Sequence, residues 1–257
     1  MGAVDYDAIA ADYDRRYAVN DYSQVRAALL DFVANITDGR VLEVGCGTGH
    51  WLRAVADADV RVAGLDPSAN MLQCARTRAP AGALIRAVAE RLPCRDAVFE
   101  RLYCINALHH FDDQPGFIAE ARRVLTAGGR LLTIGLDPHI GTDRWYIYDY
   151  FAPVPETDRR RYPSTERVRN WLRDAGFIDV HTREVQRLQT RIPAGPALDD
   201  GRLARHMTSQ LAVLSDDEYQ EGLQRIRKAV READARGETL CLTADLRLYG
   251  TYATAPR

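Results

Sequence analysis

Short apolar runs alternate with amphipathic stretches through the first half of the chain. Segments 40–44, 60–65, 83–87, 99–105 and 130–134 have the length and the aliphatic content of buried strands. Between them, apolar residues recur at helical spacing. Strands that alternate with helices predict an α/β fold with a doubly wound, mostly parallel sheet, whose ligands bind at the carboxyl ends of the strands.

The two ends of the chain follow other patterns. Residues 1–37 carry Tyr6, Tyr13 and Tyr17 in an alanine-rich stretch and then an apolar helical face, which predict an N-terminal helical cap before the core at 38–136. Residues 144–151 (RWYIYDYF) are aromatic-rich and precede a basic stretch, which indicates a substrate-side insertion or lid. We therefore expect a single domain over 1–257, in which 137–257 supply the lid and the rest of the sheet. Further elements are expected at 165–176 (helix), 177–180 (strand), 215–235 (helix) and 239–249 (strand).

Charge and composition narrow the possible partners. The 257 residues include 34 Lys and Arg against 36 Asp and Glu, so no positive field favours nucleic acid. The chain starts without a signal-peptide pattern, and no apolar run approaches membrane-spanning length. We expect a cytoplasmic protein with no membrane or nucleic-acid partner. The five cysteines are scattered, which favours reduced thiols and no metal, with a cysteine trio for a soft metal as the alternative.

One glycine-rich loop carries the clearest chemical signal. Residues 41–49 read VLEVGCGTG, so a strand delivers three glycines to the start of a helix, and the backbone can approach a ligand closely. The spacing is G-x-G-x-G, and His50 stands where a dinucleotide fingerprint has its last glycine. Asp66 ends the next strand, where a carboxylate can accept hydrogen bonds from ribose hydroxyls. Together these features predict a nucleoside ligand other than a dinucleotide.

Two further motifs extend this pattern. Residues 6–14 read YDAIAADYD, and residues 108–111, after the predicted fourth strand, read LHHF. With the glycine loop and Asp66, they resemble the class I methyltransferases that use S-adenosylmethionine (SAM), in particular the methyltransferase type 11, UbiE-like small-molecule subgroup. The resemblance covers about residues 6–136. It implies the Rossmann-like fold of that family, SAM as cofactor and S-adenosylhomocysteine (SAH) as product.

The resemblance also implies which residues surround SAM. The glycine loop would hold its methionine part, Asp66 the ribose and Met71 the adenine, while Tyr13 in the cap would close over it. Val88 replaces the family's adenine-reading acid, so adenine must be read by backbone near Ala89 or by other side chains. The implied cofactor-binding residues are Tyr13, Glu43, Gly45, Cys46, Gly47, Gly49, Asp66, Met71, Ala89, Glu90, Asn106 and Ala107.

Three histidines are candidates for catalysis. His109 and His110 follow the fourth strand and His139 follows the fifth, so all three are expected near the ligand-binding edge of the sheet. A general base is needed only if the acceptor atom holds a proton at neutral pH. The alternative is that the histidine pair is architectural and orders the loop after the fourth strand.

The segments after residue 137 suggest, but do not identify, an acceptor pocket. The rings of 145–151 are expected either to wall such a pocket and grip a cationic amine, or to bury the insertion against the domain. The arginine run 159–161 is expected either to read a carboxylate or to be a solvated face.

The leading functional hypothesis is methyl transfer from SAM to an O or N atom of a small molecule. One alternative is a SAM-binding protein without methyl transfer, in a regulatory or steering role. A second alternative is a protein or RNA methyltransferase, which the charge balance disfavours.

Overall fold

The computed structural model describes residues 6–10, 13–36, 39–79 and 82–257. Within them, eight strands form one sheet: β1 (Val41–Val44), β2 (Val62–Asp66), β3 (Ala83–Arg86), β4 (Phe99–Ile105), β5 (Leu125–Leu136), β6 (Arg144–Trp145), β7 (Ile178–Pro193) and β8 (Cys241–Thr254). The order is β3-β2-β1-β4-β5-β8-β6, with β7 on β8. Strands β1 to β5 pair in parallel, and β8 pairs antiparallel with β5, β6 and β7. The predicted α/β fold with a mostly parallel sheet is confirmed.

Helices connect the strands and build the two flanking regions. They are α1 (Tyr6–Ile9), α2 (Arg15–Val19), α3 (Ser23–Val33), α4 (His50–Ala56), α5 (Ala69–Arg78), α6 (Gln114–Val124), α7 (Tyr146–Tyr150), α8 (Val154–Arg161), α9 (Thr165–Asp174), α10 (Ala194–Asp199), α11 (Ser209–Ala212) and α12 (Asp216–Asp234), with 3-10 turns η1 (Leu108–His110) and η2 (Arg205–Met207). The predicted cap, 1–37, corresponds to α1–α3, although residues 1–5, 11–12 and 37–38 lie outside the described part of the chain.

The core sheet is covered on both faces. Along β4, Tyr103 and Ile105 pack into the core cluster that contains α3 and α4, while Leu102 and Cys104 pack into the cluster under α6 and α9. All four side chains are buried. This two-sided burial explains why the parallel strands read as continuous apolar runs in the sequence.

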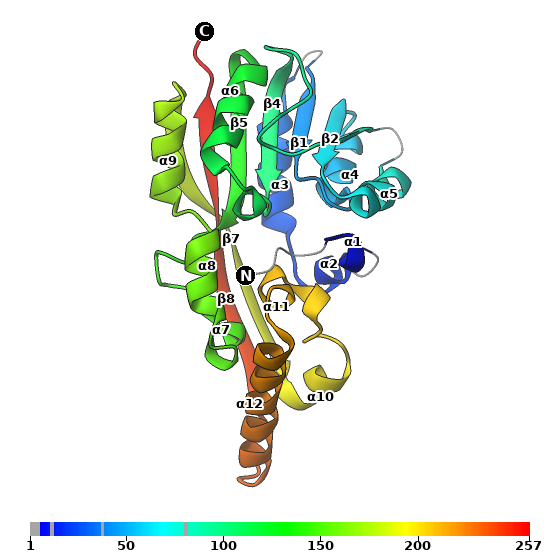
Figure 1. Cartoon of the computed structure of the whole chain (residues 1–257), viewed down its shortest axis with the longest axis vertical. Helices are drawn as coiled ribbons and strands as arrows, with labels where there is room; N and C mark the ends of the chain where they lie inside the picture. Colours follow the sequence, from blue (N-terminus) through cyan, green and yellow to red (C-terminus); the bar gives the residue numbers. More distant parts are fainter. Residues whose placement is uncertain (1–5, 11–12, 37–38, 80–81) are drawn as a thin grey trace.

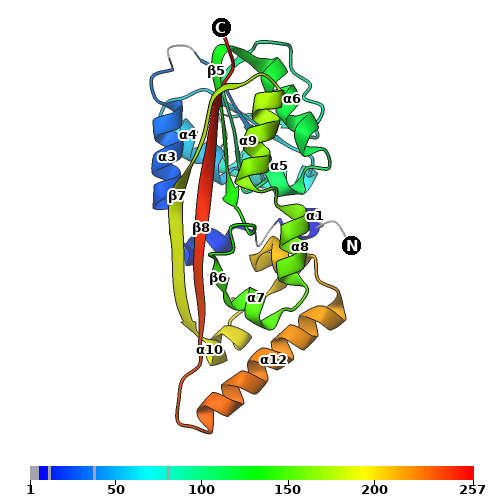
Figure 2. The ribbon, with the colours of Figure 1, turned by 90° about the vertical axis from the view of Figure 1, so that its left-hand side faces the viewer.

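The two C-terminal strands run far beyond the core sheet. Figure 2 shows β7 and β8 side by side along the length of the molecule, with α7, α8 and α10–α12 packed around their lower half. Both predicted strands were too short: 177–180 became Ile178–Pro193, and 239–249 became Cys241–Thr254. In β7 the apolar side chains Val185, Leu188 and Ile192 are separated by polar residues at uneven spacing, because only part of one face meets the core.

The cap lies where the core strands end. Figure 1 shows α1 and α2 between the carboxyl ends of the core strands and helices α10–α12. We define the lid as residues 146–162 and 194–237. Among the described residues, no helix combines the length and the apolar character that crossing a bilayer requires.

Candidate active site

A cavity of about 720 Å³ opens at the carboxyl ends of β1, β2 and β4, under the N-terminal cap. Eleven of the twelve predicted cofactor-binding residues line it. The exception is Gly49, which precedes α4 and packs against Ala75, so that its place is between two helices. The parallel topology thus brings together residues that are up to 94 positions apart, from Tyr13 to Ala107.

The glycine loop can present its backbone to a ligand. Gly45 and Gly47 have φ angles of 75° and 50°, which favour glycine. A Cβ atom on Gly45 would lie 2.4 Å from the Cβ of Ala107, so this glycine permits close packing of two loops. A Cβ atom on Gly47 would meet nothing within 4 Å, so its open face is directed at free space.

Asp66 organises the loop and keeps capacity for a ligand. Its Oδ2 accepts a hydrogen bond from the Gly47 amide at 2.8 Å, and its Oδ1 accepts one from the Ser68 amide at 2.9 Å. Burial raises the pKa of Asp66, and these two hydrogen bonds oppose that shift. Because a carboxylate offers about four acceptor positions, two remain for a pair of hydroxyls such as a ribose diol.

Glu43 supplies a second acid to the same cavity. Its side chain is buried, and the Tyr103 hydroxyl donates a hydrogen bond of 3.1 Å to Oε2. Burial raises the pKa of Glu43 well above its ordinary value. A cationic amino group placed beside it would stabilise the charged carboxylate, so Glu43 and Asp66 fit the amine and the ribose of SAM.

The cap is tied to the core by two aspartates. Asp7 accepts hydrogen bonds from the Ser68 hydroxyl and, at 3.1 Å, from the amide of Asn70. Asp14 accepts one of 2.5 Å from the Thr48 hydroxyl and forms an ion pair with Arg78. These contacts hold the cap over the cavity, with Tyr13 in its wall.

His110 sits where the cap, the core and the lid meet. Its Nε2 is 2.5 Å from the Tyr6 hydroxyl, and its Nδ1 is 3.3 Å from Nη2 of Arg161. A guanidinium only donates, so Nδ1 accepts and the neutral ring carries its proton on Nε2. Burial, with the charge of Arg161, lowers the pKa of His110 to about 3. The lone pair that a general base would use is therefore occupied in this arrangement.

The other two candidate histidines have different surroundings. His109 is buried, and its ring stacks on Tyr162 with centroids 3.8 Å apart; burial lowers its pKa well below 6.5. His139 is exposed, bonds the carbonyl of Tyr162 at 2.9 Å and lines neither cavity. Asp137 accepts hydrogen bonds from the amides of His139 and Thr165, so this acid joins the segment after β5 to the start of α9.

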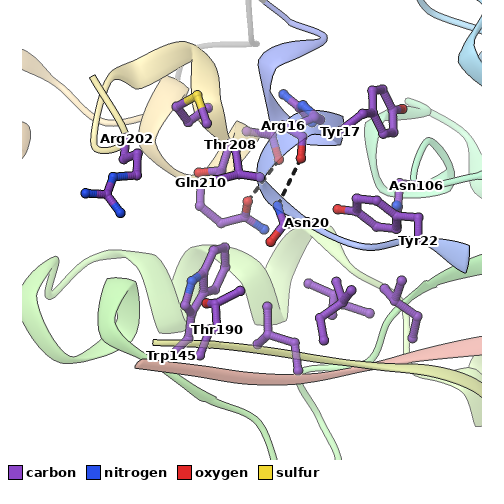
Figure 3. Close-up of a pocket in the computed structure, with 18 of the residues that line it drawn as sticks. Arg16, Tyr17, Asn20, Tyr22, Asn106, Trp145, Thr190, Arg202, Thr208 and Gln210 are labelled. Carbon is purple, nitrogen blue, oxygen red and sulfur yellow. Dashed lines mark hydrogen bonds between the residues drawn. The ribbon is translucent and has the colours of Figure 1, made fainter. Parts of the chain in front are cut away.

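A second cavity, of about 160 Å³, adjoins the first. The two share five lining residues: Tyr13, Tyr17, Asn106, His109 and His110. Figure 3 shows Trp145 and Thr190 beside the strands, opposite Thr208 and Gln210 of the lid. A second cavity beside the first, at the same edge of the sheet, is suited to bind a second substrate.

In both the aromatic segment 145–151 and the arginine run 159–161, some residues line a cavity and others do not. Trp145 and Tyr146 line the second cavity, whereas Tyr148 bonds Asp158 at 3.0 Å and Phe151 is buried in the core. Of the arginine run, Arg159 and Arg160 are exposed and pair with Glu156, and Arg160 also lines the larger cavity. Arg161 turns inward to His110 instead.

Several lining residues were absent from the sequence predictions. Tyr6 and Thr48 line the larger cavity, and Arg16 and Gln210 line the smaller one. Tyr6 and Thr48 stand inside recognised motifs, so their motif positions were an available signal. Arg16 and Gln210 belong to no motif, and only the folding of the cap and lid onto the sheet brings them together.

Comparisons with known proteins agree with this geometry. A family model described as a methyltransferase domain matches residues 42–133. A demethylmenaquinone methyltransferase of Tropheryma whipplei is 34% identical over 179 residues, which cover 65% of this chain and 75% of the relative.

Two solved structures share the fold. The YcgJ protein of Bacillus subtilis has a TM-score of 0.63 and 18% identity, covering 92% of this chain and 100% of the other. Phosphoethanolamine N-methyltransferase 2 of Haemonchus contortus, in complex with SAM, has a TM-score of 0.61 and 18% identity, covering 98% and 57%.

The matched segment starts within β1 and ends within β5, so it includes the strands and loops that frame the larger cavity. Together with the similarity to this relative, the match identifies the family and its cofactor, SAM. The chain is a SAM-dependent enzyme and belongs to the class I methyltransferases.

Proposed function

We propose that the chain transfers the methyl group of SAM to a small molecule that binds in the 160 Å³ cavity. The observation that carries this proposal is the junction of the two cavities at Asn106, His109 and His110. A methyl donor in the larger cavity and an acceptor in the smaller one would meet there. The small volume and the net charge of -2 favour a small acceptor over RNA or a protein.

The relatives' names support the same substrate class. Demethylmenaquinone methyltransferases and the O-methyltransferase rstn1 of Aspergillus nomiae are among the similar proteins, the latter 34% identical over 169 residues. We propose an O or N atom of a small molecule as the acceptor.

We further propose roles for the chain's own residues. Asp66 binds the ribose hydroxyls, Glu43 and the glycine loop bind the methionine part, and Met71 packs near the adenine, while Tyr13 closes the site. SAM supplies an electrophilic methyl group on a sulfonium. The protein then needs chiefly to align the acceptor and exclude water. Because the lone pair of His110 is engaged by Arg161, we assign the histidine pair to positioning the junction.

The test is a transfer assay with deuterated SAM and panels of small oxygen and nitrogen nucleophiles, protein extract and total RNA. We expect SAH to form only with members of the small-molecule panel, and the deuterated methyl group to appear in them. SAH formation with RNA or protein alone would contradict the proposal. Tight SAM binding without SAH formation in any panel would favour the alternative of a SAM-binding protein without methyl transfer.

A further inference from the structure

The charged side chains in the wall of the second cavity are all cationic. Arg16 comes from the cap and Arg202 from the lid, while no aspartate or glutamate is among the described residues that line it. In a confined space, an uncompensated positive charge favours an anionic ligand and opposes a cationic one.

Arg16 has only neutral partners. Its Nε donates to the carbonyl of Tyr13 at 3.0 Å, and its Nη2 donates to the carbonyl of His206 at 3.2 Å. Its guanidinium also lies 3.5 Å from the centre of the Tyr13 ring. No carboxylate in the described ranges forms an ion pair with it, and the side chain is partly buried. A guanidinium carries five N–H donors, so this one keeps donors for a ligand.

The other arginines near the site already have acids beside them. Arg202 forms an ion pair of 2.5 Å with Asp200, and Arg161 lies 3.9 Å from Oδ1 of Asp158. Among the described residues of the cavity wall, Arg16 is thus the cation whose charge is left for a ligand to compensate.

The rest of the wall sets the size and shape of the ligand. The apolar lining of the cavity includes Leu188 and Ile192 of β7, Leu246 of β8 and the ring of Trp145. A dry cavity of about 150 Å³ is large enough to bind benzene. The 160 Å³ cavity therefore suits one substituted ring or an aliphatic group of that size.

We infer that the methyl acceptor is a ring-sized molecule with a carboxylate or similar anionic group, which binds the guanidinium of Arg16. This inference rests on the proposed function, because it takes the second cavity as the acceptor site. The guanidinium of Arg16 also covers one face of the Tyr13 ring, so that face is not open to a cationic ligand.

The experiment compares three para-hydroxy probes that differ mainly in charge: 4-hydroxybenzoate, 4-hydroxybenzamide and 4-hydroxybenzylamine. Each is titrated by calorimetry into the full chain saturated with SAH. We expect the carboxylate to bind at least about ten-fold more tightly than the amide, as one charge-assisted hydrogen bond predicts, and the amine to bind most weakly. Equal affinities, a preference for the amine, or no binding of any probe would overturn the inference.

Variants then assign the preference to one residue. Arg16→Gln should remove most of the preference for the carboxylate and leave the affinity for the amide nearly unchanged. Arg16→Lys, which keeps the charge, should retain part of the preference. Arg159→Gln, which removes an exposed arginine of α8, is the matched control for net charge and should behave as the wild type. Persistence of the full preference in a folded Arg16→Gln variant would also overturn the inference.

The SAH titration in the same samples separates the two hypotheses. SAH binding without a preference for the carboxylate contradicts this inference alone. If the folded wild-type chain does not bind SAH at all, both the proposed function and this inference are contradicted. If only the Arg16→Gln variant fails to bind SAH, the affinities of the three probes for the wild-type chain still test this inference.

Discussion

Asp14 joins the N-terminal cap to the glycine loop, because its Oδ1 accepts a hydrogen bond of 2.5 Å from the hydroxyl of Thr48. Its other carboxylate oxygen pairs with Arg78 at the end of α5. One side chain of the cap thus bonds two segments of the core, and the larger cavity lies beneath it.

Loss of this contact is expected to weaken SAM binding by opening the cap. We predict that Asp14→Ala lowers the affinity about ten-fold, since a charge-assisted hydrogen bond is worth about 1.5 kcal/mol. Calorimetric titration with SAM measures the affinity, and amide hydrogen exchange should show lower protection over 13–19. Asp31→Ala, an exposed change on α3, is the control. Unchanged affinity in Asp14→Ala would show that the cap closes without this contact.

Asp66 is expected to contribute more to SAM binding than any residue of the cap. Asp66→Ala removes the proposed ribose acceptor and the acceptor for the Gly47 amide, so we predict an affinity loss of about 30-fold or more. Asp66→Asn keeps one oxygen and should show an intermediate loss. Titration with SAM and SAH measures both variants, and circular dichroism verifies folding. A folded Asp66→Ala variant with wild-type affinity would remove Asp66 from the site.

The protonation state of His110 can be measured without knowledge of the acceptor. Its pKa of about 3 lies below the ordinary value, so the ring should stay neutral as the pH falls from 8 to 5. Nitrogen-detected NMR of the imidazole signals should show no titration of His110 in that range. Protonation of His110 near pH 6.5, absent in His110→Gln, would contradict its positioning role.

Asp158 is expected to make stability fall as the pH rises. It is buried, accepts from Tyr148 at 3.0 Å and Gln210 at 3.1 Å, and burial raises its pKa from 3.8 to about 6. Because the folded-state pKa is raised, its contribution to stability is complete below pH 4 and is lost as the pH rises through about 6.

Asp158→Asn should keep an acceptor for both donors and abolish the titration. We predict that the free energy of unfolding of the variant, minus that of the wild type, rises by roughly 2–3 kcal/mol between pH 4 and pH 7. Urea unfolding at a series of pH values measures the difference. A constant difference across that range would mean that Asp158 titrates normally in the fold.

Two helical glycines should respond oppositely to alanine. A Cβ on Gly222 of α12 would lie 2.1 Å from the Phe151 ring, whereas one on Gly195 of α10 would meet nothing within 4 Å. We predict that Gly222→Ala costs about 1–3 kcal/mol of stability through overpacking, despite the higher helix propensity of alanine. Gly195→Ala should be neutral or stabilising by up to about 1 kcal/mol. Similar unfolding midpoints for the two variants would contradict this packing argument.

The sequence by itself determined the core fold and the family. The apolar runs of β1, β2 and β4, the loop from Gly45 to Gly49 and Asp66 are read from neighbouring residues, because strand burial and tight turns impose local patterns. The predicted parallel order then placed the strand ends together, since right-handed crossovers allow few alternatives.

Only the tertiary structure decided how the second cavity is built. Arg16, Trp145 and Gln210 come from the cap, the strand edge and the lid, and no local pattern marks them for one cavity. The same holds for Arg161, which differs from its neighbours Arg159 and Arg160 by the side of α8 that it occupies. Contacts between residues this far apart in the chain depend on how the lid packs against the sheet, and short-range periodicity carries no information about that packing.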